Sequence, residues 1–288
     1  MKWAGRRQSG NIEDRRGLSR GGVMATGGGI AGIIVLLLSY VLGVDISALL
    51  PQGGPQTEVG PVAERELNPT EQKLKDFTAV VLADTEDVWH ELFRSQLRGQ
   101  YREPTLVLYS GSDRSACGFA SAATGPFYCP ADEKVYIDLS FFEELERRFK
   151  ASGDFAEAYV IAHEIGHHVQ KQVGVLDDVH SRRGRVSEAE YNRLSVRLEL
   201  QADFLAGVWA HHAQRTKNIL DPGDIEEALG AAQAIGDDRL QKQAQGYVVP
   251  DAFTHGTSAQ RARWFRLGLD TGDVSRMMET FKVSYERL

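Results

Sequence analysis

The motif HExxH at residues 163–167 constrains the fold more than any other feature of the sequence. Asp154 and Glu157 have the spacing of a helix-capping box, so a helix can begin at Asp154 and run through the motif. On a helix, His163 and His167 lie about 40° apart, and both imidazoles project from one face. The motif therefore predicts a helix that offers two nitrogen ligands to a Zn²⁺ ion. The alternative is a pair of surface histidines beside a glutamate.

A second helical segment is predicted to supply the third metal ligand. It begins at Ser187, which has capping-box spacing to a following glutamate, and it carries Glu199 and Asp203 one turn apart. A catalytic zinc site takes three protein ligands and leaves one position for water. We therefore predict that His163, His167 and Glu199 bind zinc, and that Asp203 hydrogen-bonds a ligating histidine.

Small residues surround the acidic pair of this second helix. Ala202, Ala206, Gly207 and Ala210 would let the helix approach the first one closely. The alternative is an amphipathic helix whose acidic side chains are solvated, and it does not explain the small residues. We prefer the ligand interpretation for this reason.

Glu164 and His255 are the predicted catalytic residues. Glu164 lies beside the two histidines, where a carboxylate can remove a proton from a zinc-activated water and pass it to the leaving amine. His255 precedes a third capping box, at residues 257–260, and could donate to the oxyanion of a tetrahedral intermediate. A turn histidine without a catalytic role is the equal alternative. Arg261 either pairs with a carboxylate near the site or is a surface charge.

Composition and charge limit the class of protein. The chain has 288 residues, of which 42% are apolar, enough for one sizeable domain. Its net charge is −7, and its main body lacks the basic footprint that nucleic-acid binding needs. We therefore expect no nucleic-acid partner.

The two cysteines, Cys117 and Cys129, flank a segment rich in glycine and alanine. If the domain lies outside the cytoplasm, they can form a disulfide that closes this loop; the alternative is two buried free thiols. No CxxC spacing is present, which argues against a thiol metal site or a redox protein.

An apolar segment suggests a membrane anchor. No charged residue occurs between Arg20 and Asp45, and the stretch is long enough to span a bilayer. The basic residues before it predict a cytoplasmic N-terminus. A cleaved signal peptide and a buried core helix are the alternatives. We predict a basic cytoplasmic N-terminus at 1–20, a transmembrane signal anchor at 21–44, a linker at 45–65 and an extracytoplasmic catalytic domain at 66–288.

The rest of the chain predicts a mostly helical α+β domain with a small sheet. A helix should begin after Asn68 and run to about residue 99, and strands are expected at 106–109 and 135–138. From residue 140 the pattern is helical, with interruptions near 175–186 and 246–256. A strand such as 135–138, at the edge of the sheet, could pair with an extended peptide substrate.

Several blocks of the sequence resemble the bacterial family of neutral zinc metallopeptidases almost end to end. The blocks that carry the resemblance are residues 3–7, 11–17, 115–118, 125–130, 135–142, 153–164 and 255–261. The resemblance implies a membrane-anchored, zincin-like domain. The HExxH and ExxxD motifs are also similar to those of thermolysin-type gluzincins. This similarity implies that His163, His167 and Glu199 bind zinc. It also implies that Glu164 is the base and that Asp203 hydrogen-bonds a ligating histidine.

These observations predict a zinc metallopeptidase anchored in the bacterial inner membrane as a single-pass protein. We expect a peptide or protein substrate and an endopeptidase rather than an exopeptidase. The alternative is a membrane-tethered peptide-binding or quality-control module with a non-catalytic zinc site. Glu164 favours the interpretation as an enzyme, because a closed structural zinc site does not need a carboxylate at this position.

Overall fold

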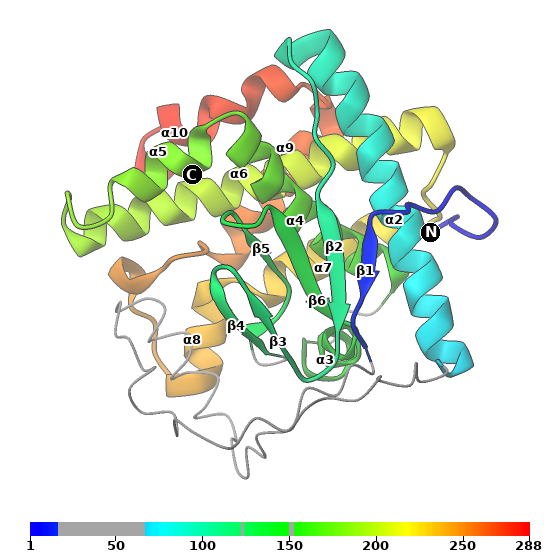
Figure 1. The fold of residues 1–288 in the computed structure, drawn as a ribbon. Helices are drawn as coiled ribbons and strands as arrows, with labels where there is room; N and C mark the ends of the chain where they lie inside the picture. The colour runs from blue at the N-terminus through cyan, green and yellow to red at the C-terminus, as the bar shows by residue number, and fades with distance from the viewer. Residues whose placement is uncertain (17–66, 122–123, 150–152) are drawn as a thin grey trace.

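Helix α4, Asp154–Gln172, is the central element of the fold (Figure 1). The structure is a computed structural model that describes residues 1–16, 67–121, 124–149 and 153–288. The elements that pack most closely against α4 are helices α2 (Pro69–Leu92), α5 (Val175–Ser181), α6 (Glu188–Lys217) and α7 (Asp224–Ala234), and strand β5 (Phe127–Cys129). Neighbours on several sides explain why its apolar residues are almost completely buried.

Within the described residues, the main sheet has four strands in the order β1-β2-β6-β5. Strands β1 (Ile12–Asp14), β2 (Thr105–Tyr109) and β6 (Lys134–Asp138) are parallel, and β5 runs antiparallel to β6. The two predicted strands are therefore present. The prediction that 135–138 forms an edge is wrong, because β6 is paired on both sides. Strand β5 is the sheet edge beside α4.

A small hairpin is attached to this edge strand. Strands β3 (Ser112–Ser115) and β4 (Gly118–Ser121) pair with each other, and Cys117 between them forms a disulfide with Cys129 of β5. The structure thus contains the disulfide that the sequence left open against free thiols.

The remaining elements make the fold mostly helical, so the predicted α+β class with a small sheet is confirmed. Helix α2 continues into a π-helical turn, Phe93–Leu97. The other helices in the described part of the chain are α3 (Ser140–Phe149), α8 (Asp237–Gln245), α9 (Ser258–Thr271) and α10 (Glu279–Lys282), with 3₁₀ turns at Pro250–Ala252, Val274–Met278 and Tyr285–Arg287. The two predicted interruptions contain α5 and the first of these 3₁₀ turns.

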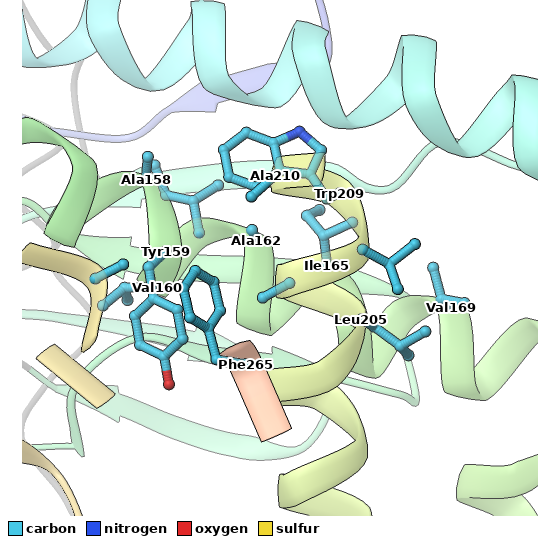
Figure 2. Close-up of a cluster of buried hydrophobic side chains, with 14 of the residues drawn as sticks. Ala158, Tyr159, Val160, Ala162, Ile165, Val169, Leu205, Trp209, Ala210 and Phe265 are labelled. Atoms are coloured by element: carbon cyan, nitrogen blue, oxygen red, sulfur yellow. The ribbon is translucent and has the colours of Figure 1, made fainter. Parts of the chain in front are cut away.

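Apolar side chains between α4, α6 and α9 form the part of the core that lies behind the site (Figure 2). Ala162 and Ile165 of α4 face Leu205 and Trp209 of α6, with Phe265 of α9 beside them. All five are at most 1% exposed. This packing fixes α4 relative to α6.

The N-terminal residues belong to the same folded body. Strand β1 pairs with β2, the Ser9 amide donates to the Ala79 carbonyl, and Arg6 lies against Asp84. Among the described residues, no helix combines the length and apolarity needed to cross a bilayer.

The predicted single-pass inner-membrane location is therefore wrong. That topology separates residues 1–20 from 66–288 by a membrane, whereas residues 1–16 pack against the domain. The predicted span 21–44, the linker 45–65 and the boundaries between the predicted segments lie outside the described residues.

Candidate metal centre

The two histidines of the HExxH motif lie on one face of α4. Their ring centroids are 4.8 Å apart and the rings are nearly perpendicular. The side chains of His163 and His167 are 7% and 12% exposed, so both are mostly buried but accessible from one side. The i, i+4 spacing therefore has the predicted effect on the helix.

Glu199 of α6 joins this pair. Its Oε2 lies 3.2 Å from His163 Nε2, and its Oε1 lies 3.5 Å from His167 Nε2. One donor atom from each residue falls within 4.8 Å of the others. The structure thus brings together the three predicted ligands from two helices.

Close helix packing makes this meeting possible. A Cβ at Gly166 would lie 3.0 Å from the Ala202 carbonyl oxygen, so the absence of a side chain at Gly166 lets α6 approach α4. Gly207 has another role than predicted. A Cβ there would lie 2.1 Å from the Phe265 carbonyl oxygen of α9, so Gly207 contacts α9 and not α4.

Asp203 holds the first histidine. His163 Nδ1 donates to Asp203 Oδ1 over 2.8 Å, and Asp203 is fully buried. Burial alone would raise the pKa of Asp203, but Arg261 and His163 outweigh it and lower this pKa to about 2. Because the ionised carboxylate accepts the Nδ1 hydrogen, Nε2 is the nitrogen of His163 that faces Glu199 and is available to a metal.

Gln170 holds the second histidine in the same way, and sequence reasoning missed it. His167 Nδ1 donates to Gln170 Oε1 over 2.9 Å, while Gln170 Nε2 donates to the Leu198 carbonyl over 2.7 Å. The second bond orients the amide so that its oxygen faces His167. Its i+3 position on the motif helix is the signal that could have identified it.

Glu164 lies beside the two histidines at 8% exposure. Burial raises the pKa of its carboxyl group, and His167, His163 and a hydrogen bond from the Tyr128 backbone oppose this. Tyr128 belongs to β5, so the edge strand runs past the predicted base.

His255 approaches the site from the loop before α9. Its ring is 38% exposed, and Nδ1 lies 3.1 Å from Asp237 Oδ1. Burial lowers the pKa of His255, but Asp237 and Glu199 outweigh it and raise this pKa. Since His255 in turn lowers the pKa of Glu199, the ring lies near the ligand cluster without joining it.

Asp237 fixes the loop that carries His255. Its Oδ2 accepts the backbone N–H groups of Thr254, His255 and Gly256 at 2.7, 2.6 and 3.1 Å. With Nδ1 of His255 held by the same carboxylate, Nε2 is left for another partner. Sequence reasoning missed Asp237, because it lies 18 residues from His255 and no spacing rule connects them.

The donor set fits a catalytic zinc ion. Zinc favours imidazole nitrogens and carboxylate oxygens, and a catalytic site uses three protein ligands with an open side. Here both histidines have their Nδ1 atoms bonded elsewhere, and the exposed edges of His167 and Glu199 leave an approach from solvent. A closed structural site would need a fourth protein ligand.

Two helices that present HExxH and ExxxD residues to one point define the class of gluzincin-type zinc metallopeptidases. The comparison with known families agrees: the family described as "Putative neutral zinc metallopeptidase" matches residues 1–281. The chain belongs to this family. The match includes the N-terminal residues that pack on the domain.

Relatives of the chain occur in distant bacteria. It is 50% identical over 284 residues to the uncharacterized protein YpfJ of Escherichia coli K12, covering 96% of this chain and 97% of that protein. It is 44% identical over 196 residues to the uncharacterized protein Rv2575 of Mycobacterium tuberculosis H37Rv, covering 64% of each. No solved structure matches the chain.

Proposed function

We propose that this protein is a zinc-dependent endopeptidase in which His163, His167 and Glu199 bind the metal. The observation that carries the proposal is the convergence of these three donors within 4.8 Å, with the Nδ1 atom of each histidine held by another residue. The family supports zinc peptidase chemistry in general.

Glu164 is the general base of the proposed reaction. A zinc ion bound at the site supplies a Lewis acid that polarises a peptide carbonyl and lowers the pKa of a water molecule. Glu164 removes the proton as water attacks the carbonyl carbon, and later delivers it to the leaving amine. Its position next to the ligands, on the face where the site opens, supports this role.

His255 donates to the oxyanion in the same proposal. Because Asp237 accepts from its Nδ1 and from the surrounding backbone amides, the ring is held in place before substrate binds. A preorganised donor of this kind stabilises the charge that develops on the carbonyl oxygen.

The free edge of β5 is the proposed docking site for substrate. Among the described residues, β5 pairs with β6 alone, and its other edge has no strand partner. An extended peptide can add to such an edge through backbone hydrogen bonds. A chain bound along a strand continues on both sides of the cleaved bond, which favours an endopeptidase.

The test compares the full chain with its Glu164→Gln variant for bound zinc and for cleavage of unfolded casein. The variant should retain zinc but lose at least about 100-fold in turnover, since general acid–base catalysis contributes about 10²–10⁴-fold. His255→Ala should also retain zinc and lose about 100-fold. Glu188→Gln, an exposed position at the start of α6, is the matched control and should behave like the parent.

Undiminished turnover in Glu164→Gln would sink the assignment of the base. Zinc and casein binding without any chelator-sensitive cleavage would favour a peptide-binding module with a non-catalytic metal. A folded parent that takes up no zinc would refute the metal site itself.

A further inference from the structure

Arg261 of α9 is buried directly behind the metal centre at 2% exposure. Its Nε lies 2.8 Å from Asp203 Oδ2, and its Nη2 lies 2.9 Å from Asp203 Oδ1. The guanidinium therefore forms a bidentate ion pair with both carboxylate oxygens of Asp203. The same Nη2 is 3.3 Å from the hydroxyl of Tyr159, which donates in turn to Asp203.

This bidentate ion pair determines the orientation of the Asp203 carboxylate. Oδ1 is the oxygen that accepts from His163, and it also contacts Tyr159 and Arg261. A planar guanidinium that bonds both oxygens fixes the plane of the carboxylate, which a single bond does not. The lone pair that receives the His163 hydrogen is thereby directed at Nδ1.

The backbone places Arg261 opposite Asp203. A Cβ at Gly268 of α9 would lie 2.1 Å from the Phe204 carbonyl oxygen of α6, so the two backbones touch there. The side chain of Thr257 caps the other end of α9, and Arg261 Nη1 donates to the Ile235 carbonyl. Arg261 is thus held from both ends of its helix and has little freedom to move.

Stability alone does not account for a fully buried ion pair. Removing two charges from water is costly, and apolar replacements of buried pairs are often neutral or stabilising. A pair that instead orients a metal ligand has a reason to be present. The same helix begins at Ser258, three residues after His255, so the ion pair also helps to fix the segment that carries His255.

We propose that Arg261 is a positioning residue for the metal: through Asp203, it holds the imidazole of His163 with Nε2 directed at the zinc position. This inference rests on the proposed function, because it assumes that His163 binds zinc. Arg261 touches neither substrate nor metal in this scheme. It acts by keeping a ligand preorganised.

The test is the zinc affinity of the full chain with Arg261→Lys, measured by competition with a chromophoric chelator. Lysine keeps the positive charge beside Asp203 but lacks the planar fork. Loss of a residue that orients a metal ligand weakens binding by about 10–100-fold, and we expect a change in this range. The visible absorption of Co²⁺ bound in place of zinc should also change, because it reports ligand geometry.

Arg263→Lys is the matched control on the same helix. Arg263 donates to the carbonyls of Arg287 and Leu288, away from Asp203, so its variant should keep the parent's zinc affinity and Co²⁺ spectrum. Melting of each metal-free variant separates a general loss of stability from a loss of metal affinity. If Arg261→Lys does not fold, Tyr159→Phe removes one hydroxyl of the network, and about a 10-fold weaker zinc affinity is expected.

Parent-like zinc affinity and an unchanged Co²⁺ spectrum in a folded Arg261→Lys chain would overturn the inference and leave the proposed function intact. Failure of both variants to fold, with or without zinc, would assign the network to folding and overturn it too. Absence of zinc from the folded parent would refute the inference together with the proposed function.

Discussion

Two acidic side chains, Asp203 and Glu157, show how partners decide the protonation state of a carboxyl group. Asp203 has Arg261 and His163 as partners, and its pKa is lowered to about 2. Glu157, in the first turn of α4, is mostly buried. Burial, with repulsion from Asp154 and Glu146, raises its pKa to about 8. Glu157 is therefore neutral at pH 7 and destabilises the fold when the pH rises.

The sign of this effect follows from linkage. Below the usual pKa of about 4.5, Glu157 is protonated whether the chain is folded or unfolded, and it contributes nothing. Between 4.5 and 8, the unfolded chain releases the proton and the folded chain keeps it, so the free energy of unfolding falls as pH rises. Glu157→Gln removes this penalty. We expect the variant to match the parent at pH 4.5 and to exceed it by roughly 5 kcal/mol at pH 8.5 in urea unfolding. Equal stabilities at pH 8.5 would contradict the raised pKa.

The residues of the site were predictable to the extent that helical spacing relates them. His163, His167, Glu199 and Asp203 lie at i, i+4 positions on two helices, and the structure brings all four together. Gln170 also follows local spacing, because it lies three residues after His167 on the same helix. The pairing of Asp237 with His255 and of Arg261 with Asp203 depends on how separate elements pack, which local spacing does not encode. The sequence thus indicates which groups can meet at a metal and leaves open what holds them there.

At the scale of elements, glycines set the distance between the helices that carry the site. Gly207 of α6 and Gly268 of α9 face each other, and a Cβ on either would lie 2.1 Å from a carbonyl oxygen of the other helix. This contact determines how α9 presents Arg261 to Asp203. In the core, small residues beside large ones on α4 and α6 also set the distance between these two helices (Figure 2).

Gly268→Ala should therefore separate α6 from α9. The added methyl overlaps backbone atoms that cannot rotate away, and overpacking of this kind costs about 1–3 kcal/mol. Gly230→Ala on α7 is the matched control, because nothing lies within 4 Å of its Cβ, and alanine should stabilise that helix by up to about 1 kcal/mol. Urea unfolding of the two variants beside the parent measures both effects. A Gly268→Ala chain as stable as Gly230→Ala would show that the helices are not held at backbone contact.

Helix starts were predictable and strand pairing was not. Asn68, Ser187 and Thr257 each cap a helix with the side chain that the spacing predicted. Asp154 does not cap α4; Gly153 occupies the cap position, and the Asp154 carboxylate contacts the Met1 amine instead. Strand β1 is only three residues long, and its parallel partner lies far away in sequence. No local alternation of apolar and polar residues therefore indicates this strand.

At the scale of the whole molecule, the basic residues of the N-terminus have a structural use. Sequence reasoning took them as a topology signal for a membrane, but they pair with acidic groups of the domain. The pairs are Arg6 with Asp84, Arg7 with Glu86 and Asp87, and Arg15 with Asp113. Basic residues before an apolar stretch are compatible with both roles. Only the fold shows that residues 1–16 complete the sheet of the domain.

Glu86 is the buried anchor of this N-terminal segment, at 1% exposure. It accepts from the Ser9 hydroxyl, from Asn11 Nδ2 at 2.9 Å and from Arg7 at 3.1 Å. Glu86→Ala leaves these donors without their acceptor, and we expect a loss of about 3 kcal/mol in the free energy of unfolding. Asp87→Ala removes a neighbouring partner of Arg7 that is 43% exposed, and it should cost no more than about 1 kcal/mol.

Hydrogen exchange locates the effect of Glu86→Ala within the molecule. The Leu106 amide of β2 donates to the Asn11 carbonyl over 2.8 Å, so it should exchange faster when residues 9–15 detach, while amides in the middle of α4 keep their protection. Asp87→Ala should leave the Leu106 amide as protected as in the parent. Uniformly faster exchange throughout the chain would mean that Glu86 supports the whole fold and not the N-terminal strand in particular. Unchanged exchange at Leu106 would mean that β1 stays paired without its buried anchor, held by its backbone hydrogen bonds to β2 and by the exposed ion pairs.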